Sequence, residues 1–414
     1  MTSRRVFLKN GAFALVSLGF APSFLARTAL AGASGRAKRL IAIFQRGAVD
    51  GLSVIVPHAE SEYYRARPSL AIARPNAGDN AALDLDGFFG FNPRLQPLKR
   101  LWDTRALAIV HACGSPDSTR SHFDAQDYME SATPGVKSTG DGWLNRYLQA
   151  QRVEMETPFR AVSLTSQLPR VLQGNAPTLA MSQIGQFGIH AGHASNTVGA
   201  SFEAQYAAAA DSVLTGTGKA AFDALRMLKA ADPSKYQAGG GAAYPQSPFG
   251  QALKQIAQLT KADVGLEIAF AEVGGWDTHV NQGAAQGQLA NRLDDFSRSL
   301  AALVTDLGDR MEDTVVLTMS EFGRAVGENG NRGTDHGHGN AMMVIGGGVR
   351  GGKVYGRWPG LAPEQRYDRR DLAITTDFRD VFGEIVVRHL GLNDPQSIFP
   401  GYSLQPSRFP GLFG

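Results

Sequence analysis

The chain has 414 residues, of which 43% are hydrophobic and 19% charged, enough to build one large domain or two smaller ones around a buried core. A net charge of +3 is small for this length and argues against a nucleic-acid-binding protein or a polybasic membrane-surface protein. The single cysteine, Cys113, excludes an intramolecular disulfide framework.

The first 31 residues are predicted to be an export signal. Paired arginines at 4–5 precede a moderately apolar stretch at 11–25, and the small-x-small sequence at 29–31 is typical of a cleavage site. The pattern resembles a twin-arginine signal, which the twin-arginine translocation machinery reads. The apolar stretch is short and broken for a permanent membrane span. We therefore expect a mature chain of residues 32–414 that is periplasmic or secreted.

The first predicted strand of the mature chain is Arg39–Phe44. The glycines that follow it allow a sharp turn and leave Asp50 at the carboxyl end of the strand. Two interpretations of Asp50 stay open at this point. It is either a metal ligand or the first residue of an ordinary Asp-Gly turn.

A second strand is predicted at Leu107–Ala112, and a helix at Phe123–Ser131. Ser121 resembles the N-cap of this helix, with Asp124 three residues later as its capping carboxylate. A hydroxyl at a helix N-terminus lies among unpaired N–H groups, which suits an anionic substrate and a nucleophilic oxygen. Ser121 is therefore either a nucleophile or only a cap.

The residues just before Ser121 offer alternatives for the same chemistry. Ser118 and Thr119 also carry hydroxyl groups and compete with Ser121 as the nucleophile. Arg120 either binds the anionic substrate or is simply solvated. We take Ser121 and Arg120 as the candidate catalytic pair.

The middle of the chain carries less chemical information. A strand is predicted at Arg160–Thr165, followed by a Gly-rich stretch with His190 and His193, whose glycines favour a loop. Helices are predicted at Phe202–Asp232 and Pro248–Ala262. We expect this region, about residues 200–262, to be a helical insertion or a cap on the sheet.

The pattern of the first strand returns at Leu266–Ala271, where an apolar run leads through glycines to Asp277 and His279. An amphipathic helix is predicted at Gln288–Met311. It leads to a further strand at Thr314–Met319, a β-branched run that is typical of a strand buried on both faces.

Glu321 stands directly after this strand, and a Gly/Asn-rich loop then carries Asp335, His336 and His338. A strand at Met342–Ile345 and a helix at 377–390 complete the prediction. Carboxylate and imidazole groups are ligands of divalent metals.

Alternating strands and helices predict a mostly parallel, doubly wound α/β sheet with right-handed crossovers. Such sheets bind their ligands at the carboxyl ends of the strands. Two divalent ions, with Zn²⁺, Mn²⁺ and Ca²⁺ all open, would be able to share the ligand-type residues at this edge. The predicted metal ligands are Asp50, Asp277, His279, Glu321, Asp335, His336 and His338.

Five motifs, RGAVDG, SHFDAQDYME, GGWDTH, SEFGR and TDHGHGNAMMVIGG, together resemble the DUF1501 family, which is related to the alkaline-phosphatase-like superfamily. The resemblance covers essentially the whole mature chain. It implies a three-layer α/β/α fold with a two-metal centre of the phosphatase or sulfatase type. By the same resemblance, Asp277, His279 and His338 would hold one ion. Asp50, Glu321 and His336 would hold the other, with Asp335 as a further ligand.

Two functions follow from these predictions. The first is an exported metal-dependent hydrolase of a phosphate or sulfate ester, in which a metal-activated Ser121 attacks the substrate. The second is a non-catalytic envelope protein that uses the same fold to bind an anionic ligand or a partner.

Overall fold

The computed structural model describes residues 8–9, 12–13, 38–151, 157–184 and 235–414. The chain divides into two units, Met1–Lys38 and Arg39–Gly414. In the first unit, β1 (Leu8–Lys9) pairs antiparallel with β2 (Ala12–Phe13). The rest of the predicted export signal lies outside the described residues. So do the predicted helix at 202–232 and the two histidines at 190 and 193.

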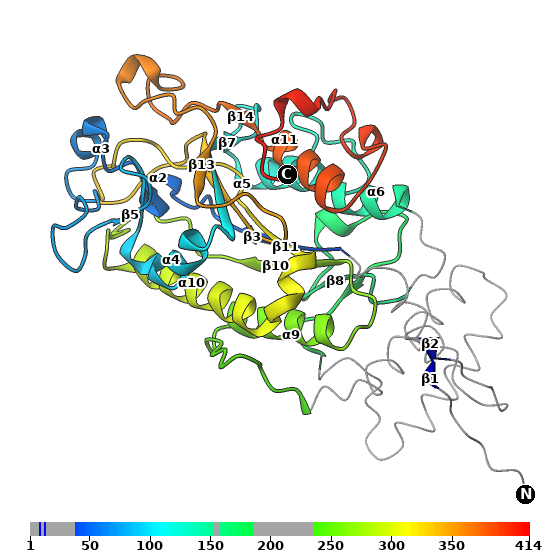
Figure 1. The fold of residues 1–414 in the computed structure, drawn as a ribbon. Coiled ribbons are helices and arrows are strands. Elements are labelled where there is room, and N and C mark those ends of the chain that lie inside the picture. The colour runs from blue at the N-terminus through cyan, green and yellow to red at the C-terminus, as the bar shows by residue number, and fades with distance from the viewer. Residues whose placement is uncertain (1–7, 10–11, 14–37, 152–156, 185–234) are drawn as a thin grey trace, which may run out of the picture. The chain divides into compact units, whose positions relative to one another are not determined.

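A nine-stranded sheet forms the centre of the second unit (Figure 1). Its strands are β3 (Arg39–Gln45), β7 (Leu107–Gly114), β8 (Ala161–Ser163), β9 (Leu179–Ala180), β10 (Ile268–Val273), β11 (Thr314–Met319), β12 (Asn340–Gly346), β13 (Lys353–Tyr355) and β14 (Thr376–Asp377). The order is β13-β7-β12-β11-β3-β10-β8-β9, and β14 pairs with β7. The mostly parallel sheet that the sequence predicts is confirmed.

The exception is β12, which runs antiparallel to both of its neighbours, β11 and β7. A parallel connection needs a crossover that returns the chain to the opposite edge, usually through a helix. No α-helix lies between β11 and β12, so the chain re-enters the sheet at the edge where it left. The antiparallel direction of β12 therefore keeps residues 320–339 at one edge.

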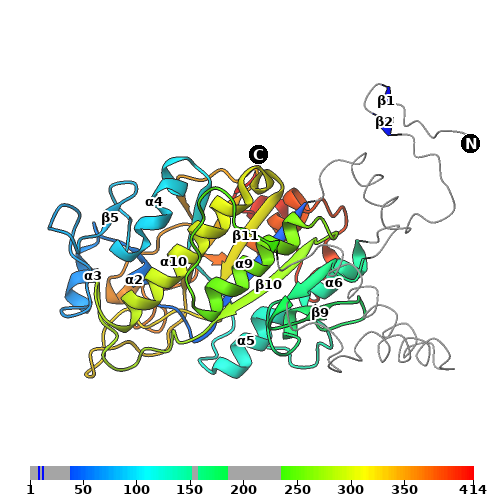
Figure 2. The same ribbon diagram turned by 90° about the horizontal axis from the view of Figure 1, so that it is seen from below.

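Helices cover both faces of the sheet and make three layers. One face packs against α4 (Gln96–Asp103), α9 (Pro248–Lys261) and α10 (Gln288–Leu307), which lie in front of the sheet in Figure 2. The other face packs against α5 (His122–Ser131), α6 (Trp143–Ala150) and α11 (Phe378–Glu384). The predicted three-layer α/β/α arrangement is confirmed.

Side chains alternate between these two cores because successive residues of a strand point to opposite faces. In β3, Ile41 and Ile43 belong to the core beneath α9 and α10, whereas Leu40, Ala42 and Phe44 belong to the other core. The continuous apolar runs of the sequence therefore correspond to strands that are buried on both faces.

Smaller elements complete the unit. A three-stranded antiparallel sheet contains β4 (Ile55–Val56), β5 (Leu83–Asp84) and β6 (Gly90–Phe91), and two short helices are α2 (Gly51–Val54) and α3 (Ser61–Ala66). Short 3₁₀ turns occur at Pro93–Leu95, Arg170–Leu172, Gly308–Asp313, Pro363–Gln365, Gln396–Ile398 and Pro406–Arg408. A π-helical turn, Ile385–His389, follows α11.

The predicted helix at Gln288–Met311 ends earlier than its sequence pattern suggests. Its α-helical part stops at Leu307, and Gly308 has a positive φ of 51° before the chain tightens into a 3₁₀ turn. The last part of the region predicted as an insertion or cap, α9, packs against α10 and β10 within the helical layer. Among the described residues, we find no helix both long and apolar enough to cross a bilayer.

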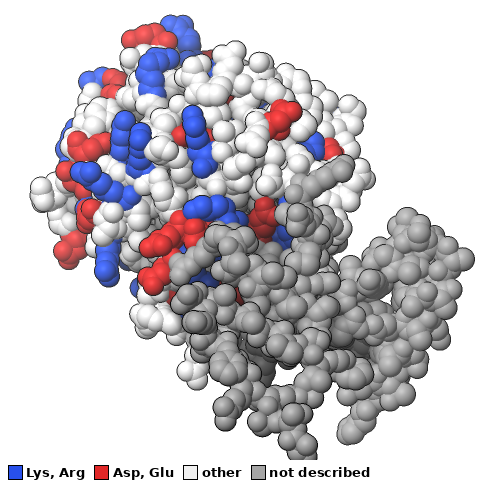
Figure 3. Space-filling view, turned by 45° about the vertical axis from the view of Figure 1, so that its right-hand side comes forward, with Lys and Arg blue, Asp and Glu red and all other residues white. Residues whose placement is uncertain are grey.

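The carboxyl ends of three central strands are level, since Val273 of β10 pairs with Gln45 of β3, and Met319 of β11 pairs with Phe44. The loops after these strands, the start of α5 after β7 and the residues before β12 all arrive at this edge. Elsewhere on the surface, the face in Figure 3 shows acidic and basic side chains interspersed, with no broad area of one sign.

Candidate metal centre

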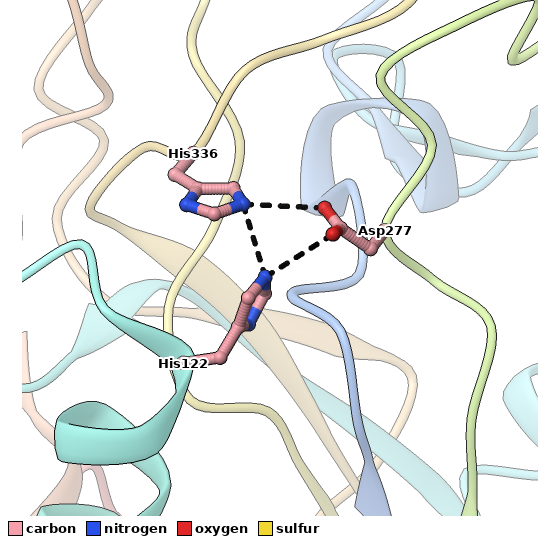
Figure 4. A group of neighbouring side chains, drawn as sticks. All are labelled: His122, Asp277 and His336. Atoms are coloured by element: carbon pink, nitrogen blue, oxygen red, sulfur yellow. Dashed lines mark hydrogen bonds and ion pairs between the residues drawn. The ribbon is translucent and has the colours of Figure 1, made fainter.

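Three side chains from distant parts of the sequence meet at this edge (Figure 4). His122 is the first residue of α5, Asp277 lies in the loop after β10, and His336 lies in the loop before β12. One potential ligand atom from each lies within 4.8 Å of the other two. Nε2 of His122 is 3.0 Å from Nε2 of His336, which in turn is 3.2 Å from Oδ1 of Asp277.

His279 is a fourth member of this group. Its Nε2 lies 2.9 Å from Oδ1 of Asp277 and 3.0 Å from Nε2 of His336. We refer to His122, Asp277, His279 and His336 as the His/Asp cluster.

The outer nitrogen of each imidazole faces an oxygen acceptor. Nδ1 of His122 lies 2.8 Å from Oε1 of Glu321, and Nδ1 of His279 lies 3.1 Å from Oδ1 of Asp335. Nδ1 of His336 lies 2.8 Å from the backbone carbonyl oxygen of Arg120. Carbonyl and ionised carboxylate oxygens only accept hydrogen bonds, so each Nδ1 carries the proton and donates it.

When all three rings are neutral, as metal binding requires, the Nε2 atoms present lone pairs to one another and to the Asp277 carboxylate. Such an arrangement repels itself unless a proton or a cation lies among the lone pairs. Ligand atoms that lie about 2.0–2.1 Å from a tetrahedral Zn²⁺ are roughly 3.3 Å apart. The contacts between neighbouring ligand atoms of the cluster, 2.9–3.5 Å long, lie around this value, so the residues fit a divalent metal.

Charged neighbours hold the cluster in place. Arg324 is buried, and its guanidinium donates to Oδ1 of Asp277 at 2.5 Å and to the backbone carbonyls of Gly47, Ala48, Trp276 and Thr334. Burial alone would raise the pKa of Asp277, but the hydrogen bond and charge of Arg324 lower it. Asp277 is therefore an ionised carboxylate with one oxygen fixed in position.

The imidazoles of His122 and His336 differ in their electrostatic environment. The hydrogen bond to Glu321 raises the pKa of His122. Burial lowers the pKa of His336. Hydrogen bonds from His122, Gln126 and the backbone N–H of Gly47 keep the pKa of the buried Glu321 low, although burial alone would raise it.

The structure thus places the predicted ligands in different positions. Asp277, His279 and His336 belong to the His/Asp cluster, while Glu321 and Asp335 contact the outer nitrogens of its rings. Both remaining predicted ligands lie outside the cluster. Asp50 pairs with Arg67, and His338 is buried and stacks on Tyr367 with a ring-centroid distance of 4.1 Å.

The predicted catalytic residues lie beside the cluster. Ser121 is the N-cap of α5, and its Oγ accepts from the backbone N–H of Asp124 at 3.5 Å. The guanidinium of Arg120 donates to Oδ2 of Asp371 at 2.6 Å, and its backbone carbonyl orients His336. Of the alternatives, Ser118 is exposed, and Oγ1 of Thr119 accepts from the backbone N–H of Ser121.

His122 is the functional candidate that sequence reasoning missed. The pattern Ser121-His122 draws attention to the capping hydroxyl, and Asp124, two residues after His122, is interpreted as the capping carboxylate rather than as the partner of a metal-binding imidazole. The available signal is the position of His122 at the start of the helix that follows the carboxyl end of β7, the same edge of the sheet at which Asp277 and His279 follow β10.

A three-layer α/β fold with a cluster of imidazole and carboxylate groups at its sheet edge defines a candidate metalloprotein. Residues 107–397 match the family described as "Protein of unknown function (DUF1501)", and the chain belongs to this family. The resemblance seen in the sequence motifs is confirmed in this respect. No protein with curated functional information matches the chain.

Two solved structures are similar to the chain. The C-terminal periplasmic domain of EcEptC from Escherichia coli, in complex with Zn, has 9% identity and a TM-score of 0.36, over 76% of this chain and 74% of that one. The PsFucS1 sulfatase from Pseudoalteromonas sp. has 12% identity and a TM-score of 0.40, over 92% of this chain and 74% of that one. Both TM-scores are below 0.5, so neither similarity bears on the function of this chain.

Proposed function

We propose that this protein is an exported, metal-dependent hydrolase of phosphate or sulfate esters. The observation that carries the proposal is the convergence of three Nε2 atoms on the Asp277 carboxylate, while each Nδ1 faces an oxygen acceptor on the outside of the cluster. A divalent ion bound there would polarise an ester oxygen and balance the negative charge that develops on it. Zn²⁺ suits two imidazoles and one carboxylate, and ligation by His122, Asp277 and His336 would leave one tetrahedral position open for the ester, with Mn²⁺ and Ca²⁺ as alternative ions.

The chain's own residues supply the rest of the chemistry. Ser121 directly precedes His122, so the N-cap hydroxyl is the proposed nucleophile at the start of α5. The backbone carbonyl of Arg120 accepts a hydrogen bond from His336, and the guanidinium of Arg120 is held by Asp371. Support for export comes from the paired arginines and the apolar stretch at the start of the sequence.

A second candidate is a metal-binding envelope protein without catalytic activity. The observation that favours it is the position of His279, because a fourth protein ligand would close a tetrahedral site. Structural zinc sites have four protein ligands, whereas catalytic sites leave one position open.

Elemental analysis of the purified mature chain, followed by assays on aryl phosphates and aryl sulfates, separates the two candidates. The hydrolase predicts bound metal and turnover, and Ser121→Ala should abolish turnover while the metal is retained. Ser118→Ala is the matched control and should remain active. Stoichiometric metal without turnover on a broad panel of esters would favour the second candidate.

Export is tested separately by cell fractionation. Replacing both Arg4 and Arg5 with Lys should leave the protein in the cytoplasm, because the translocation machinery reads the arginine pair. Unchanged export of this variant would contradict the twin-arginine assignment.

A further inference from the structure

The resemblance to two-metal phosphatases implies a second ion held by Asp50, Glu321 and His336. In the structure these three residues do not form a common site. His336 belongs to the His/Asp cluster, and the other two carboxylates have different partners.

Both carboxylate oxygens of Asp50 accept hydrogen bonds from Arg67. Oδ2 of Asp50 accepts from Nη1 of Arg67 at 2.6 Å, and Oδ1 accepts from Nη2 at 3.0 Å. Oδ2 also accepts from Nε2 of Gln282 at 2.7 Å. Burial alone would raise the pKa of Asp50, but the charge and hydrogen bonds of Arg67 lower it. The carboxylate is 1% exposed and already fully paired with a cation.

The side chain of Arg67 has no exposed surface, and all of its donors are used. A guanidinium has five N–H donors. Besides its two bonds to Asp50, it donates to the hydroxyl of Ser53 and to the backbone carbonyls of Ala325 and Val326. Each donor therefore has an acceptor, which fixes a positive charge beside Asp50 without any metal ion.

Glu321 has hydrogen-bond partners of a different kind. Oε1 accepts from His122, from Nε2 of Gln126 at 2.9 Å and from the backbone N–H of Gly47 at 2.8 Å. Oε2 accepts from the hydroxyl of Ser320 at 3.0 Å. The imidazole of His122 separates this carboxylate from the other members of the His/Asp cluster, since its Nδ1 faces Glu321 and its Nε2 faces His336.

We infer that this centre holds one metal ion per chain and that the guanidinium of Arg67 occupies the electrostatic role of a second ion at Asp50. The inference rests on the proposed metal centre and specifies its composition. Asp50 is then a positioning residue. Through Gln282, it is connected to the hydroxyl groups of Thr278 and Thr334, which flank the segments carrying the cluster.

The test is the stoichiometry of metal binding by the full mature chain. Metal-free protein is titrated separately with Zn²⁺, Mn²⁺ and Ca²⁺, and bound metal is counted by native mass spectrometry and elemental analysis. One equivalent is expected even with excess metal. Two equivalents in the wild-type protein would overturn the inference and leave the proposed hydrolase intact. No bound metal would overturn the metal centre itself, and the inference with it.

A matched pair of variants locates the ion. Asp277→Asn should lose the bound equivalent, whereas Asp50→Asn should still bind one equivalent at saturating metal. If Asp50→Asn does not fold because Arg67 is left unpaired, the double variant Asp50→Asn/Arg67→Met serves in its place. Loss of metal from the Asp50 variant, with Asp277→Asn unaffected, would contradict the assignment. Ester turnover is measured in parallel and bears only on the hydrolase proposal.

Discussion

Asp50 and Asp277 follow neighbouring parallel strands at the same edge of the sheet, but they differ in burial and in the partners of their carboxylates. Each follows a strand of the same parallel pair, β3 and β10, at the same edge of the sheet. Asp50 is 1% exposed and forms a two-pronged ion pair with Arg67, whereas the side chain of Asp277 is 44% exposed and faces three imidazoles. Residue type and strand position are shared, so the difference lies in the partners.

Arginine contacts both carboxylates, but in different ways. Arg67 occupies both oxygens of Asp50. Arg324 donates to Oδ1 of Asp277, and Oδ2 faces Nε2 of His122 at 3.5 Å. A carboxylate can serve a metal centre only where its cationic partner leaves an oxygen available. Asp277 meets this condition and Asp50 does not.

The largest effect is expected for Arg67→Met. Removal of one partner from a fully buried ion pair leaves Asp50 charged and unpaired, so the free energy of unfolding should fall by about 3–5 kcal/mol. Urea unfolding of the metal-free protein measures this change. The double variant Asp50→Asn/Arg67→Met should lose less, because no buried charge remains. Equal losses in both variants would show that packing, rather than the ion pair, stabilises this region.

The next effect distinguishes two histidines of one loop. His336→Ala should weaken metal binding by more than about 100-fold, beyond what changes to outer-shell residues usually cost, because it removes a central Nε2 donor. His338→Ala is the matched control and should retain metal, since His338 is stacked on Tyr367. Competition with a chelator measures both affinities. Loss of metal affinity in both variants would instead support the ligand set implied by the family resemblance, which contains both histidines.

The sequence allowed the edge of the sheet to be predicted, but not the chemistry at that edge. Buried apolar runs such as Thr314–Met319 identify strands directly, and parallel alternation brings their carboxyl ends together. The partners of each side chain depend on tertiary contacts that leave no periodic signal. Arg67 and His122 are examples, since neither has a spacing that connects it to Asp50 or Asp277. The reversed direction of β12 likewise follows from a missing crossover helix.

Glu321→Gln should reduce metal affinity by about 10–100-fold, a smaller effect than loss of a ligand. Glutamine keeps an oxygen near Nδ1 of His122 but loses the negative charge that orients and polarises the ring. The variant Asp335→Asn is the comparison at His279, where the carboxylate is 55% exposed and its charge is more strongly screened by solvent. It should change the affinity less. A total loss of metal from Glu321→Gln would instead indicate direct ligation.

The smallest effects are expected from changes of pH. They should appear in different pH ranges for the His/Asp cluster and for the ion pair of Asp50 with Arg67. Metal binds neutral imidazole, and the hydrogen bond to Glu321 raises the pKa of His122 above its ordinary value of 6.5. As the pH falls through this raised pKa, zinc affinity should decline by about tenfold per unit for one displaced proton. Chelator competition between pH 5.5 and 8 measures the slope.

Asp50 should respond only at much lower pH. Arg67 lowers its pKa in the folded protein below the ordinary value of 3.8, so the unfolded chain binds the proton more readily. Its contribution to stability is therefore present above about pH 4 and is lost as the pH falls through the folded-state pKa. The free energy of unfolding of the metal-free wild-type protein should therefore decrease at acidic pH, and the decrease should be smaller in Asp50→Asn/Arg67→Met. The same decrease in both proteins would mean that other carboxylates dominate acid unfolding.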